Sequence, residues 1–216
     1  DDPRVAKAAA QAAREGIADI QLIGPTAEIQ ALLDGEEGAG KIEVLDPASS
    51  PWLERYSLEY FELRKHKGMT LEQARAAMRG QLGFAAMMVR LGDSDGTIGG
   101  AVATTKDTVR TALQVIGKAA GANVVSSCFL MSLAPPFDQA VIFADCGLIL
   151  QPTSAELASI AIASAESLSV FTGQTPRVAM LSFSTMGSVR ADAHESINRI
   201  RSSIKLIRQQ APDLNV

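Results

Sequence analysis

The sequence predicts an α/β protein, built as three layers with helices on both sides of a sheet. Two observations carry this prediction. Helix and strand patterns alternate along the chain, and three times an apolar, strand-like run leads into a polar loop and then a helix. These runs cover residues 95–101, 141–146 and 178–184. With 216 residues, 47% of them hydrophobic, the chain can bury a core of the size that such a fold needs.

The first part of the chain shows the alternation clearly. Asp2 and Pro3 are typical of a helix start, and they predict a helix over residues 3–15 that ends at Gly16. The elements expected next are a strand, a helix capped by Thr26 and a second strand, over residues 19–23, 26–33 and 41–45.

The middle of the chain is predicted to be helical. Apolar residues on one face indicate a helix over residues 52–66, which Gly68 ends. Thr70 and Gln73 have the spacing of a capping box at the start of the next helix. Residues 81–91 are apolar nearly all round, which predicts a buried helix.

A glycine-containing stretch over residues 117–123 is the expected boundary between two subdomains. We expect an N-terminal α/β subdomain over residues 1–120 and a second, incomplete α/β subdomain over residues 121–216. The elements expected on either side of the boundary are a strand over 96–101, a helix over 106–117, strands over 123–131 and 139–145, a helix over 154–171, a strand over 177–183 and a helix over 190–210.

Composition excludes several classes of protein. The net charge of −4 argues against binding to duplex nucleic acid, which favours a basic surface. The chain shows neither a signal-peptide profile nor an apolar run approaching the roughly 18 residues of a membrane span, so a cytoplasmic location is expected. Cys128 and Cys146 lie in apolar segments and are expected to be free thiols in a reducing compartment.

The three polar loops predict a phosphate site. In an open α/β sheet the carboxyl ends of the strands line one crevice, and helix N-termini there present unpaired N–H groups to anions. We therefore expect the loops after residues 101, 146 and 182 to converge on one cavity for negatively charged ligands.

The chain also resembles a known family. The matching stretches run in the family's order over essentially the whole chain, and they include Asp1–Val5, Val44–Pro47, Leu63–Gly68, Phe143–Cys146 and Met180–Thr185. They are similar to the phosphate acetyltransferase (phosphotransacetylase) family and its phosphate butyryltransferase relatives.

The resemblance implies acyl transfer between coenzyme A and inorganic phosphate, in which acetyl-CoA and phosphate give acetyl phosphate and coenzyme A. It implies a fold similar to that of isocitrate and isopropylmalate dehydrogenases, with a cleft between two subdomains. It further implies that coenzyme A is a substrate, that no cofactor is tightly bound, and that the protein is a homodimer. The apolar segments over residues 81–91 and 154–171 are the candidate dimer faces.

Four residues of the first subdomain are candidates for binding coenzyme A or phosphate. By resemblance, Arg64 and Arg110 match two family arginines associated with the coenzyme A phosphates. Thr104 and Thr105 begin the helix that carries Arg110, and an arginine fork there can bind two phosphate oxygens at once. The alternative for Arg64 is ordinary charge at a helix C-terminus.

A second set of residues, mostly with hydroxyl groups, could cradle the acyl phosphate. It consists of Ser126, Ser127, Asp145, Cys146, Ser182, Ser184, Thr185, Gly187 and Ser188. Simpler interpretations remain open. The serines after residue 181 can cap a helix, Ser126 and Ser127 can be strand residues, and Asp145 can be a cap or a loop acceptor.

The expected mechanism is direct attack. A base deprotonates the coenzyme A thiol, the thiolate attacks the acyl carbonyl, and phosphate leaves while cations and N–H groups stabilise its charge. No covalent enzyme intermediate is needed. His66 and His194 stand alone without metal-ligand spacing, so no metal site is expected.

The resemblance also indicates what the chain lacks. The family's Ser-Arg-Gly motif and the aspartate proposed as thiol base are expected beyond Val216, and a strand is expected before Asp1. We therefore expect a piece of a longer protein that is inactive or barely active by itself. The chain departs from common family residues at Ala103, Thr111, Met186 and Val189, which leaves acyl specificity and turnover open.

One alternative function remains from a different class. Domains of this type also occur fused behind malic enzymes, so the chain could be a non-catalytic, acyl-CoA-binding regulatory or oligomerising module. A dinucleotide-dependent dehydrogenase is disfavoured, because the first predicted strand is followed by Gly24 and Pro25 rather than by Gly-x-Gly-x-x-Gly.

Overall fold

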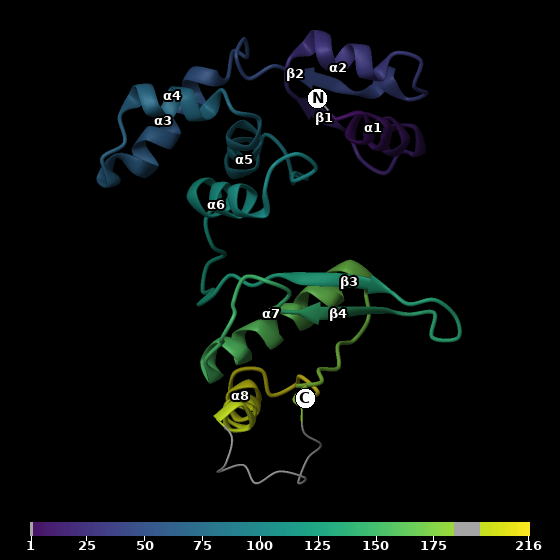
Figure 1. Cartoon of the computed structure of the whole chain (residues 1–216), viewed down its shortest axis with the longest axis vertical. Coiled ribbons are helices and arrows are strands. Elements are labelled where there is room, and N and C mark those ends of the chain that lie inside the picture. The colour runs from purple at the N-terminus through teal and green to yellow at the C-terminus, as the bar shows by residue number, and fades with distance from the viewer. Residues whose placement is uncertain (1, 184–194) are drawn as a thin grey trace. The chain divides into compact units, whose positions relative to one another are not determined.

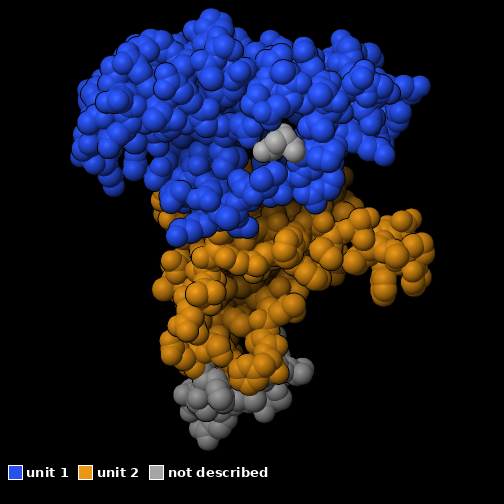
Figure 2. Space-filling model, turned by 45° about the horizontal axis from the view of Figure 1, so that its top comes forward, with its two compact units in different colours: residues 1–117 blue, residues 118–216 orange. Residues whose placement is uncertain are grey.

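The computed structural model describes residues 2–183 and 195–216, and these ranges contain both helices and short strands (Figure 1). This arrangement confirms the predicted α/β class. The chain forms two compact units, Asp1–Gly117 and Lys118–Val216, called unit 1 and unit 2 below (Figure 2). Each unit is described by itself.

Unit 1 begins with a small α/β layer. Helix α1 (Pro3–Glu15) is capped by Asp2, whose carboxylate accepts from the Arg4 N–H at 2.8 Å, and it ends at Gly16. Strand β1 (Gln21–Ile23) pairs in parallel with β2 (Glu43–Leu45), as expected for strands joined by a helix. Helix α2 (Thr26–Leu33) and the short 3-10 helix η1 (Ala39–Lys41) connect them.

The predicted cap at Thr26 is wrong. Pro25 occupies the cap position, and its ring holds φ near −57°, so Thr26 already belongs to the first helical turn. Apolar residues of α1 and α2, namely Ala6, Ala10, Ile29 and Leu33, pack together above Leu22 and Val44 of the two strands.

Four further helices complete unit 1. They are α3 (Leu53–Arg64), α4 (Leu71–Met78), α5 (Gln81–Leu91) and α6 (Thr105–Val115), with the 3-10 helix η2 (Lys65–Lys67) after α3. The predicted capping box of α4 is present, because Gln73 N–H donates to Thr70 Oγ1 at 3.2 Å and Thr70 N–H donates to Gln73 Oε1 at 2.9 Å.

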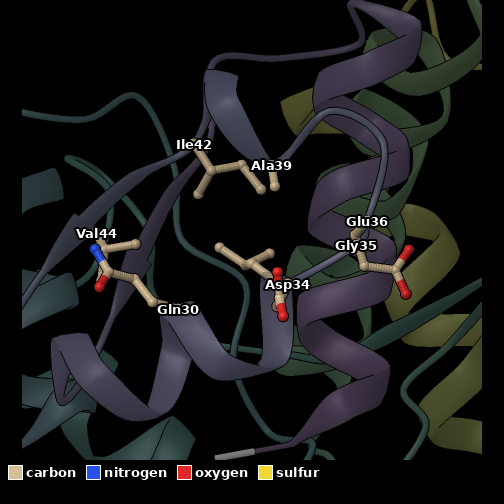
Figure 3. A pocket seen from close by; sticks show the side chains of 8 residues that line it. Gln30, Asp34, Gly35, Glu36, Ala39, Ile42 and Val44 are labelled. Atoms are coloured by element: carbon tan, nitrogen blue, oxygen red, sulfur yellow. The ribbon is translucent and has the colours of Figure 1, made fainter.

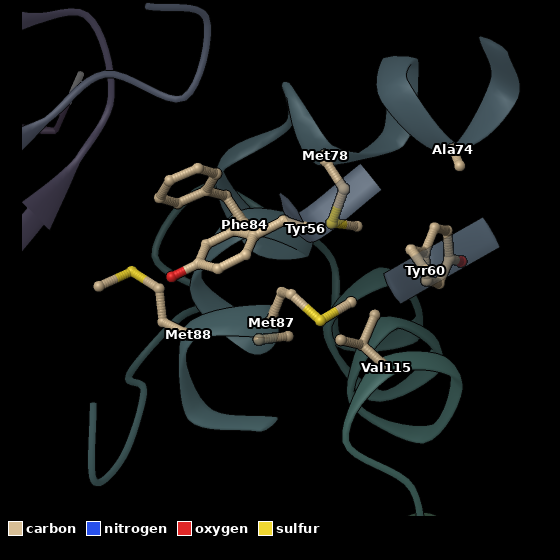
Figure 4. Packing of buried hydrophobic residues seen from close by; sticks show 9 residues of the cluster. Tyr56, Tyr60, Ala74, Met78, Phe84, Met87, Met88 and Val115 are labelled. Carbon is tan, nitrogen blue, oxygen red and sulfur yellow. The ribbon is translucent and has the colours of Figure 1, made fainter. Parts of the chain in front are cut away.

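The core of these helices is dense in aromatic and methionine side chains (Figure 4). The rings of Tyr56 and Phe84 lie 4.9 Å apart between centroids, and Met78 and Met87 are fully buried beside them. Helix α5 supplies much of this core, so the prediction that it is buried is confirmed. The suggestion that α5 also offers a dimer face stays a prediction, and the burial of Phe84, Met87 and Met88 inside unit 1 counts against it.

The strand predicted over residues 96–101 is absent. Ile98 and Val102 are instead exposed, Ile98 completely so. An extended segment becomes a strand only when a neighbouring strand pairs with its backbone groups. In the part of the chain that the structure describes, β1 and β2 pair only with each other, so this segment has no partner.

Unit 2 contains a β-hairpin and two long helices. Strands β3 (Cys128–Ser132) and β4 (Ala140–Ala144) are antiparallel, followed by α7 (Ser154–Thr172) and α8 (Glu195–Gln210). Helix α8 was expected from residue 190, but residues 190–194 lie outside the described part of the chain.

The core of unit 2 is small. Ala158 and Ala161 of α7 pack against Ile207 of α8, with Val178 and Met180 beside them. The strand predicted over 177–183 is not formed among the described residues, where its only ladder contact is an isolated bridge between Arg177 and Asn215. The described residues thus hold two separate two-stranded sheets, and the three-layer arrangement stays a prediction.

Helix α7 corrects one expectation from composition. Its 19 residues make it long and apolar enough to cross a membrane by length and composition, so the statement that no segment approaches this length is wrong. The helix packs against α8 through Ala158 and Ala161. Core helices of folded domains pass the same test, so α7 alone is weak evidence for a membrane span.

Candidate functional site

In unit 1 the candidate residues Thr104, Thr105 and Arg110 lie on the first two turns of α6. Thr104 caps the helix, accepting from the Asp107 N–H at 3.1 Å and donating its hydroxyl to Asp107 Oδ2 at 2.7 Å. Arg110 Nη2 donates to Asp107 Oδ1 at 2.6 Å, although the arginine side chain is still 57% exposed. Asp107 therefore provides an internal carboxylate at the helix end where a phosphate site was predicted.

Asp107 is not among the residues that the sequence predicted for the site. The signal was present, because an acidic residue three positions after a threonine is typical of a helix cap, and residues three apart face each other on a helix. A phosphate that binds Arg110 has to compete with this carboxylate.

The candidate Arg64 is the last residue of α3 and is half-buried. Its Nε is buried and has no hydrogen-bond partner among the described residues. A buried donor without a partner is costly, so this N–H is available to an acceptor such as a phosphate oxygen.

Helices α3 and α6 are joined by a hydrogen bond from the Tyr60 hydroxyl to Gln114 Oε1, at 3.1 Å. Arg64 lies four residues after Tyr60 on α3, and Arg110 lies four residues before Gln114 on α6. The two arginines thus belong to one pair of helices that contact each other. Their role in binding coenzyme A stays a prediction.

In unit 2 the candidates Ser127 and Asp145 form one hydrogen-bonded cluster. Asp145 Oδ1 accepts from Ser127 Oγ at 2.8 Å, Gly147 N–H at 2.6 Å and Leu148 N–H at 2.8 Å, and Oδ2 accepts from Ser127 N–H at 3.1 Å. Ser127 Oγ in turn accepts from the Cys146 N–H at 3.0 Å. We call these five residues, Ser127 and Asp145–Leu148, the Asp145 cluster.

The cluster determines the charge of its carboxylate. Burial alone raises the pKa of Asp145, but the backbone donors of Gly147, Leu148 and Ser127 and the Ser127 hydroxyl outweigh burial and lower that pKa to about 2. Asp145 is therefore ionised at neutral pH.

Sequence reasoning placed Ser127 and Asp145 in one pocket but could not pair them, because no local signal joins residues 18 positions apart. The pairing comes from the hairpin, in which Cys128 lies opposite Ala144 and so brings their outer neighbours together.

The remaining candidates of unit 2 lie outside the Asp145 cluster, except for Cys146. Ser126 is half-buried, and none of the hydrogen bonds between described residues involves its hydroxyl. Ser182 is exposed. Cys146 Sγ lies 2.9 Å from the Phe143 carbonyl oxygen, and both Cys146 and Cys128 are free thiols. Outside the described residues lie the candidates Ser184, Thr185, Gly187 and Ser188, together with Met186, Val189 and His194.

Two surface hollows do not coincide with the candidate residues. A hollow of about 330 Å³ in unit 1 is lined by α2, η1 and β2, with the carboxylates of Asp34 and Glu36 at its rim (Figure 3). A carboxylate rim with no basic side chain does not suit a phosphate. The loop behind it approaches α1 closely, since a Cβ on Gly38 would lie 2.4 Å from the Ala10 carbonyl oxygen.

The second hollow, of about 390 Å³, lies in unit 2 between β4, α7 and α8. Its lining is mostly apolar and includes Leu150, Met180 and Arg199. Arg199 Nη1 donates to the Pro152 carbonyl at 3.2 Å. Within the described ranges, no group of three or more metal-binding side chains occurs.

Comparison with known proteins gives a consistent result. The family model described as phosphate acetyl/butaryl transferase matches residues 1–216. The phosphate acetyltransferase of Paracoccus denitrificans is 49% identical, over 100% of this chain and 64% of the relative. That of Thermoanaerobacterium thermosaccharolyticum is 39% identical, over 100% of this chain and 65% of the relative.

Solved structures agree with the sequence comparison. A phosphotransacetylase from Streptococcus pyogenes superposes with a TM-score of 0.89 at 33% identity, over 99% of this chain and 64% of that chain. The EutD phosphotransacetylase from Staphylococcus aureus gives 0.84 at 34% identity, over 98% and 62%. The chain thus spans less than two thirds of the length of these relatives. Because the family match runs from the first residue to the last, the chain belongs to the phosphate acetyl/butaryl transferase family.

Proposed function

We propose that this chain is part of an acyltransferase that converts acetyl-CoA and inorganic phosphate to acetyl phosphate and coenzyme A, and the reverse. One observation carries the proposal, namely that the chain matches phosphate acetyltransferases along its whole length. The relatives named above carry the name of the enzyme, and nothing in them favours the malic-enzyme-type regulatory module.

In the direction of acyl-CoA synthesis, the thiolate of coenzyme A attacks the carbonyl carbon of acetyl phosphate. The C–S bond forms, the bond from the carbonyl carbon to the phosphate oxygen breaks, and phosphate leaves with the electron pair. Asp145 does not suit the role of thiol base, because its four donors stabilise the charged carboxylate and hold its pKa at about 2, which makes it a weak base. The base is expected outside this sequence.

Unit 1 is proposed to bind the phosphate groups of coenzyme A through Arg64 and Arg110. Arg64 contributes a donor that no described residue uses, and Arg110 contributes a half-exposed fork. The acyl phosphate is proposed to contact hydroxyl groups of unit 2, among them Ser126, which no described residue engages, and the candidates after Phe183.

The remaining features of the proposal concern the whole protein. Coenzyme A acts as substrate and no cofactor is tightly bound, the protein is cytoplasmic and binds neither nucleic acid nor membrane, and it is a homodimer. Helix α7 is the dimer face that we retain from the two suggested, since Val170 and Phe171 on it are exposed.

The test is an assay of acetyl phosphate formation from acetyl-CoA and phosphate, using the complete protein that carries this sequence. Arg110→Ala should raise the KM for acetyl-CoA about tenfold or more, as expected for a lost charged hydrogen bond. Arg79→Ala, which removes an exposed arginine at the end of α4, is the matched control and should leave KM unchanged.

Asp107→Ala separates binding from helix stability. If Arg110 acts only through its ion pair with Asp107, this variant raises KM as much as Arg110→Ala does. If Arg110 binds phosphate, removing the competing carboxylate leaves KM equal or lowers it. Absence of acetyl phosphate formation by the wild-type protein would refute the proposed activity.

A further inference from the structure

We propose that Asp145 is a positioning residue, which holds the ends of β3 and β4 in one geometry without touching the substrate. Its influence on the reaction rests on the proposed function. Its structural role rests on the Asp145 cluster alone.

The Asp145 carboxylate is held by donors from the protein itself. A carboxylate has two oxygens with about four acceptor sites in total. In this structure four donors reach those oxygens at 2.6 to 3.1 Å, three of them backbone N–H groups. Three of the donors reach Oδ1 and one reaches Oδ2, so Oδ1 is fully engaged and most of the carboxylate is occupied by the protein's own groups. Its negative charge would also repel an acyl phosphate.

The hydrogen bonds of Asp145 connect the two ends of the β3–β4 hairpin. Ser127 precedes β3, and Gly147 and Leu148 follow β4, so one side chain ties the incoming and outgoing ends of the hairpin together. The bond from Cys146 N–H to Ser127 Oγ closes the network from the opposite direction. The backbone of 145–148 therefore depends on Asp145 and Ser127 jointly.

Ser126 is the residue next to the Asp145 cluster that can contact a substrate. Ser126 adjoins this fixed segment, and none of the hydrogen bonds between described residues involves its hydroxyl. The Asp145 cluster thus uses the Ser127 hydroxyl internally and makes no bond to the Ser126 hydroxyl. Asp145 acts on substrate only by determining where such neighbours lie.

The structural test is amide hydrogen exchange by NMR on this 216-residue chain. Asp145→Ala should accelerate exchange at Ser127, Gly147 and Leu148 by about tenfold or more, and Asp145→Asn by less, because its amide oxygen still accepts. Amides in the buried turn of α7 around Ala158 serve as the reference and should be unchanged.

A serine pair provides the second arm. Ser127→Ala should expose the Cys146 amide, whereas Ser127→Thr keeps the hydroxyl and should restore its protection. Ser132→Ala, at the exposed far end of β3, is the matched control. If Asp145→Ala does not fold, Asp145→Asn and the two Ser127 variants still test the structural role of Asp145. Unchanged protection at residues 146–148 in every variant, or an equal rise across α7 and α8, overturns the proposal.

The functional arm uses the acetyl-CoA and phosphate assay. A positioning residue predicts that Asp145→Asn lowers kcat about tenfold, with the KM for acetyl-CoA unchanged within about twofold and the pH profile at the same position. A displaced acid limb of the pH profile would instead make Asp145 the base and overturn the proposal. Should the wild-type protein lack the activity, the proposed function fails while the exchange data still decide the role of Asp145.

Discussion

Units 1 and 2 bury their large apolar side chains to different degrees. In unit 1, Tyr56, Phe84, Met78 and Met87 are fully buried within one cluster. In unit 2, Ile207 is the only large apolar side chain with that degree of burial among the described residues. The exposed large apolar residues of unit 2 are Phe129, Leu130, Met131, Phe137, Phe143, Leu150, Val170, Phe171, Leu181 and Phe183.

The difference follows from how each core is assembled. Helices α3, α4 and α5 follow one another in sequence, so each covers the apolar face of its neighbour. A hairpin has two faces and two edges, and only β4 lies against α7, which leaves all five residues of β3 exposed. Exposed apolar surface of this kind is typical of a contact surface, so unit 2 is the half that other polypeptide is expected to cover.

The largest expected effect is in the core of unit 1. Phe84→Ala removes a fully buried ring that packs on Tyr56, and it should lower the free energy of unfolding of unit 1 by about 3–5 kcal/mol. Denaturant unfolding with hydrogen exchange resolved by unit measures this. Leu58→Ala, at an exposed position on α3, is the control with about 0.5 kcal/mol or less.

A somewhat smaller effect is expected in unit 2. Ile207→Ala should cost about 2–3 kcal/mol, toward the lower end for such a change, because the core around it is small and near the surface. Ser202→Ala, at an exposed position on α8, is the control. A loss equal to or larger than that of Phe84→Ala would contradict the contrast between the two units.

Helix caps should contribute the same free energy of unfolding in both units. Thr70→Ala in unit 1 and Thr153→Ala in unit 2 each break a complete capping box and should each cost about 1 kcal/mol. Thermal unfolding of each variant measures the loss. Ser159→Ala, within α7, should have a smaller effect, and a clear difference between the two caps would show that the cores influence them.

The smallest expected effect is a dependence on acidic pH. The folded pKa of Asp145 is about 2, below its ordinary value of 3.8, so its stabilising contribution is complete above about pH 4 and is lost as pH falls toward 2. Asp145→Asn should remove this part of the acid sensitivity of unit 2. Hydrogen bonding to Arg75 lowers the pKa of Glu54 in the same direction, so Glu54→Gln is the corresponding variant in unit 1. Acid titrations of unfolding, followed separately in each unit, test both.

Local signals in the sequence predicted the helices well. Asp2 and Gly16 delimit α1, and the Thr70–Gln73 pair starts α4, because capping bonds join residues within one turn. The apolar pattern of residues 81–91 also predicted burial correctly, since a helix without a polar face has to be covered on every side.

Strands and the candidate site could be predicted only in part. The apolar runs at 96–101 and 177–183 had the right composition, but a strand also needs a pairing partner, and that partner can lie anywhere in the chain. The sequence named Ser127 and Asp145 separately, and it missed the pairing of Arg110 with Asp107. The loop over residues 184–188, proposed to hold the acyl phosphate, lies outside what the structure describes.

The sequence by itself determined the α/β class, the positions of the helices and the family, because these depend on local periodicity, capping and residue identity. Only the tertiary structure decided which apolar runs become strands, that Asp107 pairs with Arg110, and that Ser127, Asp145 and the Cys146 amide form one network. The physical reason is the separation in sequence of the residues that interact. A helix satisfies its backbone groups within the segment itself, whereas strand pairing, core packing and the Asp145 cluster require residues that are distant in sequence to meet.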